Sequence, residues 1–115
     1  MRKIERQMNF ALSNKANWSK ANTSVSYNDS TNCSSVFLHG HQIAVLDHNT
    51  KAIKLSSCGY ETVTTKSRLN AILDEVAYGA RVFQRQFEWF ISYNNSTESF
   101  WDGMILFPNE SVLSF

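Results

Sequence analysis

The sequence predicts a single α+β domain over residues 1–115, in which a mainly antiparallel sheet packs against two helices. Two segments, residues 2–13 and 65–78, repeat apolar residues at spacings of three and four, which is typical of amphipathic helices. Between them lie four short stretches rich in β-forming residues and separated by turn-forming sequence, as in an antiparallel meander. Alternating apolar and polar residues after the second helix predict a C-terminal hairpin.

Length and composition limit the classes of protein. With 115 residues, 43% of them hydrophobic, the chain is long enough to bury about two thirds of its unfolded surface in one core. The formal net charge of +1 gives no broad attraction for anions, so an anion site must be local. No apolar run approaches the roughly 20 residues of a membrane span, and the charged start does not resemble a signal peptide. We therefore expect a cytoplasmic protein without membrane contact, whose cysteines, Cys33 and Cys58, are reduced and separate.

The first predicted helix, residues 2–13, places Ile4, Met8, Ala11 and Leu12 on one face. The meander follows, with strands expected at residues 23–27, 34–38, 43–46 and 52–55. The second of these strands contains the run Val36-Phe37-Leu38, which does not alternate and predicts a central strand covered on both faces.

The second predicted helix follows a glycine-marked loop. Thr64 or Thr65 is expected to be its N-cap, because a hydroxyl oxygen can accept a hydrogen bond from a free N–H group of the first turn. The helix is expected to end near Tyr78, with Gly79 in the left-handed conformation that follows many helices. Its buried face would consist of Leu69, Ile72, Leu73 and Val76.

The C-terminal part is rich in aromatic residues. An alternating strand is expected to bury one face made of Phe87, Trp89, Ile91 and Tyr93. Residues 94–97 close a hairpin, and residues 104–107 form the last strand. The chain ends on an apolar segment, residues 112–115, which a partner chain could cover, so we expect a homodimer.

The loop and the start of the second helix form the candidate ligand-binding site, with Tyr60, Thr64, Thr65, Lys66 and Arg68. Hydroxyls, free N–H groups and two cations at a helix start are the groups that hold a phosphate or a carboxylate. Arg68 is expected to matter most, because its planar fork can bind two oxygens. The alternative is that both cations lie in solvent or pair with Asp74 or Glu61.

Other chemistries are less well supported. The spacing of His39, His41, His48 and the two cysteines does not place two metal ligands on one turn, so no metal or other cofactor is expected. No nucleophile motif or phosphate-binding glycine loop is present, and we expect a protein that is not an enzyme. A further set of residues, Phe83, Phe87, Trp89 and Phe90, is either core or a platform on which bases stack.

Three stretches, residues 36–44, 64–71 and 83–90, carry a resemblance to a family of small tailed-phage proteins common among phages of marine cyanobacteria. The likeness runs from residue 1 to about residue 107. Tyr60 stands where the family suggests a more tryptophan-like residue, and Cys58 lies at a variable position, which argues against a catalytic thiol. The resemblance implies an origin and no mechanism. Phage accessory proteins of this size are often binders of host factors, antagonists of host defence or sponges for nucleotide signals.

These observations lead to one functional hypothesis with two alternatives. The leading hypothesis is non-enzymatic binding of a small phosphate-bearing ligand, namely a nucleotide, by a phage protein that acts on host defence or metabolism. The alternatives are a single-stranded nucleic-acid binder and an inhibitor that docks on a host protein.

Overall fold

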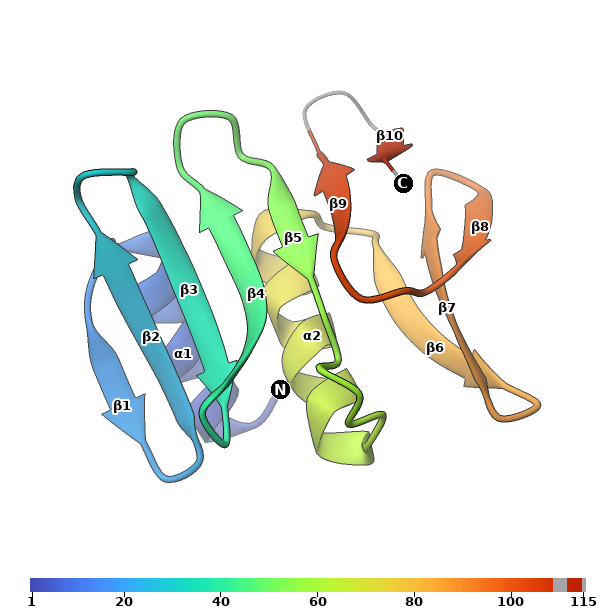
Figure 1. The fold of residues 1–115 in the computed structure, drawn as a ribbon, viewed down its shortest axis with the longest axis horizontal. Coiled ribbons are helices and arrows are strands. Elements are labelled where there is room, and N and C mark those ends of the chain that lie inside the picture. Colours follow the sequence, from blue (N-terminus) through green and yellow to red (C-terminus); the bar gives the residue numbers. More distant parts are fainter. Residues whose placement is uncertain (109–111, 115) are drawn as a thin grey trace.

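The structure is a computed structural model that describes residues 1–108 and 112–114. These residues form two helices and two antiparallel sheets, which confirms the α+β class (Figure 1). The elements are α1 (Lys3–Ser13), β1 (Trp18–Lys20), β2 (Thr23–Asn28), β3 (Cys33–Leu38), β4 (His41–Asp47), β5 (Ile53–Leu55), α2 (Val63–Val76), β6 (Arg81–Arg85), β7 (Glu88–Tyr93), β8 (Ser96–Ser99), β9 (Met104–Phe107) and β10 (Val112–Ser114).

The larger sheet has the strand order β1-β2-β3-β4-β5-β9-β10, and both helices lie on the same face of it (Figure 1). In strand β3 the side chains of Ser34, Val36 and Leu38 are buried, whereas those of the intervening residues are half-buried. The prediction that this strand is covered on both faces is therefore wrong. The register between β3 and β4 shifts between Val36 and Phe37, where the extra residue, Ile43, lies on β4, so this irregularity does not interrupt the alternation along β3.

The smaller sheet, β6-β7-β8, stands beyond α2 at one end of the molecule (Figure 1). Asn70 on α2 holds it in place, because its side-chain amide donates to the carbonyl of Val82 at 2.9 Å and accepts from the N–H of Val82 at 2.8 Å. Trp89 and Ile91 belong to the same hydrophobic core as the larger sheet. The two sheets therefore share one core.

Several boundaries differ from the sequence expectation. The sequence does not predict strands β1, β6, β8 and β10, which have three to five residues each. Residues 96 and 97, expected in the hairpin turn, belong to β8, which is polar and exposed. Helix α2 begins at Val63 and ends at Val76, two residues earlier at each end than expected, although Gly79 has the expected positive φ of 96°. Phe87 is not the first inward residue of β7: it lies in the turn before the strand and is 92% exposed.

The C-terminal segment bears on the expected homodimer. Strand β10 pairs antiparallel with β9, with Val112 opposite Phe107. Residues 109–111 and 115 lie outside the described residues, as do the side chains of 112–114. The apolar terminus that motivates the homodimer hence remains a prediction from the sequence.

Candidate functional site

The structure distributes the five predicted site residues over three places around the start of α2. Tyr60, Thr64 and Thr65 line one pocket of about 340 Å³. Lys66 lines a different pocket, and Arg68 lies in the interior. The candidate site is therefore the pocket that Tyr60, Thr64 and Thr65 share, which we call the Tyr60 pocket.

Helix α2 contributes its first turn to this pocket. The N-cap is Thr62, whose hydroxyl oxygen accepts from the N–H of Thr65 at 3.1 Å, so the expectation that Thr64 or Thr65 is the cap is wrong. Thr65 cannot serve as the cap because it is the third residue of the helix. Its side chain is buried, and its hydroxyl lies 2.9 Å from that of Thr62. The N–H of Lys66 bonds to the carbonyl of Thr62. In a capped first turn of this kind the N–H groups of Val63 and Thr64 have no helical partner.

The loop before α2 is fixed from a distant part of the chain. The carboxylate of Asp102 accepts from the backbone N–H of Ser57 at 2.7 Å, from its hydroxyl at 2.9 Å, and from the N–H of Gly59 at 3.3 Å. Cys58 and Gly59 both adopt positive φ values, of 55° and 80°. The thiol of Cys58 donates to the carbonyl of Gln42 at 3.0 Å, which ties the loop to β4. These bonds hold Tyr60 in position.

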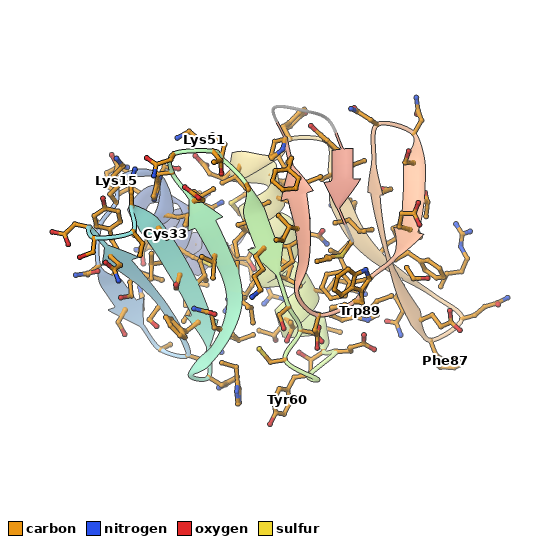
Figure 2. All side chains as sticks on the ribbon, turned by 45° about the horizontal axis from the view of Figure 1, so that its top comes forward. Lys15, Cys33, Lys51, Tyr60, Phe87 and Trp89 are labelled. Atoms are coloured by element: carbon orange, nitrogen blue, oxygen red, sulfur yellow. The ribbon has the colours of Figure 1, made fainter. Side chains whose placement is uncertain are left out.

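The opposite wall of the Tyr60 pocket is the hairpin turn between β3 and β4. His39 and Gly40 form this turn with positive φ values of 52° and 78°. The ring of His41 lies 4.7 Å from that of Tyr60, with 32° between their planes. Tyr60 is 54% exposed and projects from the loop (Figure 2), so part of its ring remains available to a ligand.

The sequence did not indicate that His41 or Asp102 contributes to this site, although His39 and His41 were considered as metal ligands. Among the described residues, no group of three or more His, Cys, Asp or Glu side chains is placed to hold a metal ion. His41 meets Tyr60 only because the β3–β4 turn lies beside the start of α2, and Asp102 is 45 residues from Ser57. No local sequence pattern predicts either contact.

Arg68 is not available to a ligand, which corrects the sequence expectation. Its Nη1 lies 2.8 Å from Oε2 of Glu5 on α1, and both side chains are 4% exposed. Its Nε donates to the hydroxyl of Thr23 at 3.0 Å, and the hydroxyl of Ser67 donates to the same carboxylate of Glu5 at 2.6 Å. The partner of Arg68 is therefore neither solvent nor the Asp74 or Glu61 that the sequence suggested.

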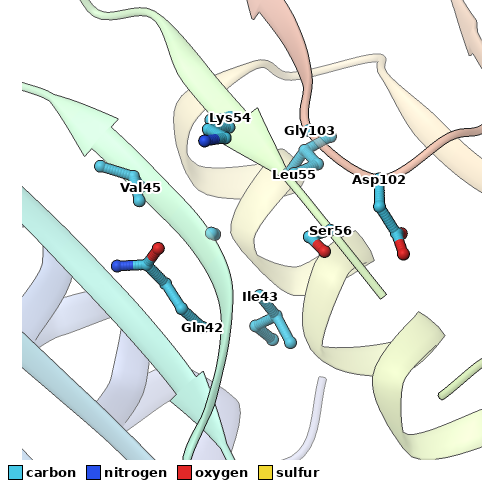
Figure 3. A pocket seen from close by; sticks show the side chains of 9 residues that line it. Gln42, Ile43, Val45, Lys54, Leu55, Ser56, Asp102 and Gly103 are labelled. Atoms are coloured by element: carbon cyan, nitrogen blue, oxygen red, sulfur yellow. The ribbon is translucent and has the colours of Figure 1, made fainter. Parts of the chain in front are cut away.

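A second pocket of about 250 Å³ lies between β4 and β5 (Figure 3). It opens where the pairing of these strands ends, at Ala44 opposite Leu55. Lys54, Gln42 and Asp102 are among its lining residues, but the carboxylate of Asp102 is already bonded to the loop before α2. This pocket therefore lies next to the loop that carries Tyr60.

His48 serves the fold and not the pocket. Its Nε2 is hydrogen-bonded to the hydroxyl of Ser34 at 2.8 Å, and its ring packs edge-on against Tyr27. Burial lowers the pKa of His48, and the positive charges of Lys51 and Lys15 lower it further, against a smaller opposing effect of Asp47. Figure 2 shows both lysines at this end of the molecule.

The described residues contain no helix that is long and apolar enough to cross a membrane. Fold and site together describe a small α+β protein with a pocket of about 340 Å³ beside a capped helix start. The chain belongs to the Kyanoviridae Gp96 protein family, a family of cyanophage proteins, whose family model matches residues 1–107. No curated protein and no solved structure matches the chain.

Proposed function

We propose that this phage protein binds a small nucleotide, without turning it over, in the Tyr60 pocket. One observation carries the proposal: an exposed aromatic ring pair, His41 and Tyr60, lines the same pocket as the first turn of α2. A volume of about 340 Å³ lies within the range of small-molecule sites.

The two halves of a nucleotide match the two walls of the pocket. A base can stack on the exposed ring of Tyr60, an interaction worth about 1–3 kcal/mol per base. A phosphate can accept hydrogen bonds from the N–H group and the hydroxyl of Thr64, where the helix dipole also favours negative charge. The proposal keeps the ligand class expected from the sequence, but it removes Lys66 and Arg68 from the site and adds His39, His41 and Thr62.

Binding without turnover is part of the proposal, since the pocket wall offers groups that can hydrogen-bond or stack. The side chains that line the pocket are hydroxyls, two imidazoles, a phenol and two aliphatic groups. In the cytoplasm of an infected cell, such a protein would act as a sponge for a nucleotide signal of host defence.

The test begins with mass spectrometry of the small molecules that co-purify with the full chain. Calorimetric titration with the nucleotide so identified then compares the wild type with Tyr60→Ala and Tyr78→Ala. Tyr78 is a matched control, because it is 88% exposed and follows the other end of α2. We expect Tyr60→Ala to weaken binding by about tenfold or more, as the loss of one stacked base implies, and Tyr78→Ala to leave it unchanged. Equal affinities of the two variants would refute the proposal.

A host-protein inhibitor is a second candidate, favoured by a separate observation. An apolar depression lies beside α1, lined by Phe10, Ala11, Ala16 and Trp18 among others, and Phe10 is 71% exposed. An exposed apolar patch of this kind is typical of protein contacts. Capture of one defined host protein by the wild type, and its loss in Phe10→Ser with Tyr60→Ala as the control, would favour this role.

A further inference from the structure

A second surface, on the other side of the first turn of α2, gathers cations from three parts of the chain. Arg2, Lys66 and Arg81 line a pocket of about 360 Å³ together with the carboxylates of Glu5 and Asp74. The carboxylate of Glu5 is already neutralised by its ion pair with Arg68. Cations therefore outnumber free carboxylates in this pocket, although the whole chain has a net charge of only +1.

Arg81 connects this pocket to the outer face of the smaller sheet. It is the first residue of β6, and alternation along the strand places Arg81, Phe83 and Arg85 on the face opposite the buried Val82. Phe83 is paired with Phe90 of β7, and their rings stack at 5.7 Å with 24° between the planes. The guanidinium of Arg85 lies 5.6 Å from the centre of the Phe83 ring. A half-exposed pair of rings is thus flanked by two arginines, one of which, Arg85, lies opposite Glu88 on β7.

Phe87 extends this surface to the tip of the hairpin (Figure 2). Gln86 and Phe87 form the two-residue turn between β6 and β7, with φ values of 51° and 67°. Asparagine and glycine are the residues that such turns favour, because both positions need positive φ. A phenylalanine that is 92% exposed there gains nothing from burial and adopts a backbone conformation that it disfavours. Its ring is free to contact another molecule.

We propose that this surface, which we call the arginine–phenylalanine track, binds single-stranded nucleic acid. The track runs from Arg2, Lys66 and Arg81 across Phe83 and Phe90 to Phe87. Cations alternating with exposed rings are what a single strand requires, since its phosphates need neutralising and its unpaired bases need stacking partners. The site is separate from the Tyr60 pocket, because Lys66 and Ser67 line the track side of α2, whereas Thr62 and Thr65 line the Tyr60 pocket.

Fluorescence anisotropy with labelled oligothymidylates of about 4 to 16 nucleotides, at about 50 mM salt, tests the track on the full chain. The variants are the double change Arg81→Gln with Arg85→Gln, and the single change Phe87→Ala. The matched control, Lys15→Gln with Lys20→Gln, also removes two charges, but away from the smaller sheet: Lys20 ends β1, the far edge strand of the larger sheet, and Lys15 lies at the same side of the molecule (Figure 2). All these side chains are exposed, so the variants are expected to fold, which circular dichroism checks.

We expect the wild type to bind more tightly as the oligomer lengthens. The arginine variant should bind about tenfold or more weakly and lose about 0.7 from its salt slope for each phosphate contact removed. Phe87→Ala should bind about fivefold or more weakly through loss of a stacked base, and the lysine control should stay within about twofold of the wild type.

The track would be overturned by no binding of the wild type at low salt, by equal binding of a duplex of the same length, or by the same affinity for the arginine variant as for the lysine control. Tyr60→Ala distinguishes the two proposed sites, because it should leave oligothymidylate binding unchanged. Loss of oligothymidylate binding in Tyr60→Ala would place the strand in the Tyr60 pocket and contradict the track. Unchanged oligothymidylate binding in Tyr60→Ala, together with weakened binding in the arginine variant, would support the track as a site of its own.

Discussion

Replacing Arg68 by alanine should lower the free energy of unfolding far more than a substitution in the candidate ligand site would. Arg68 joins α2 to α1 through its 2.8 Å ion pair with Glu5, and it also donates to the hydroxyl of Thr23 on β2. Both charged side chains are 4% exposed, so the carboxylate that remains in Arg68→Ala cannot recover its hydration. It keeps one hydrogen bond, from Ser67.

The expected loss follows from this geometry. Removing one partner of a buried ion pair destabilises a protein by about 3–5 kcal/mol, because the other charge stays buried without compensation. The free energy of unfolding of a domain is about 5–15 kcal/mol, so this loss is a large part of the total. We expect the melting temperature to fall by roughly 10 °C or more.

Urea unfolding followed by circular dichroism measures the effect, with Lys66→Ala as the control. Lys66 lies two residues before Arg68 on the same helix but is half-buried and has no ion pair among the described residues, so its loss should change the free energy of unfolding by less than about 0.5 kcal/mol. Arg68→Met combined with Glu5→Leu removes both charges and should regain much of the stability that Arg68→Ala loses. If Arg68→Ala proved as stable as Lys66→Ala, the pair would not be buried as the structure has it.

The remaining predictions concern the helix cap, pH, thiols and assembly. Thr62→Ala should destabilise the fold by about 1 kcal/mol in thermal melts, whereas Thr64→Ala should not, and the opposite order would contradict the assigned cap. Burial lowers the pKa of His48 in the folded protein, so its contribution to stability is complete above the unfolded pKa of about 6.5 and is lost as the pH falls toward the folded pKa. In urea melts at several pH values, the free energy of unfolding of His48→Gln should fall less steeply below about pH 6.5 than that of the wild type. The same pH dependence in both proteins would count against this effect. Thiol titration of the unfolded, non-reduced protein should find both cysteines free, and finding neither would refute the prediction. Light scattering should give the mass of a dimer for the full chain and the mass of a monomer after deletion of residues 110–115. A monomer mass for both chains would exclude the homodimer.

Local patterns in the sequence determined the helices, most strands and the class of fold. Leu69, Ile72 and Leu73 are all fully buried, as their helical spacing predicts. Gly79 has the left-handed conformation expected after a helix. These features depend on neighbours a few residues apart, so the sequence carries them directly.

Only the tertiary structure decided which polar residues are available to a ligand. Lys66 and Arg68 look equivalent in the sequence, yet successive residues turn by about 100° around a helix, so the two side chains point in nearly opposite directions. The spacing of Arg68 from Leu69 and Ile72 does place it on the apolar face, which was a signal that it needs a buried acid. That acid, Glu5, is 63 residues away, and the contact of His41 with Tyr60 likewise joins a hairpin turn to a distant loop. Such pairs form only when the chain packs, because no local pattern specifies which distant residue will be opposite.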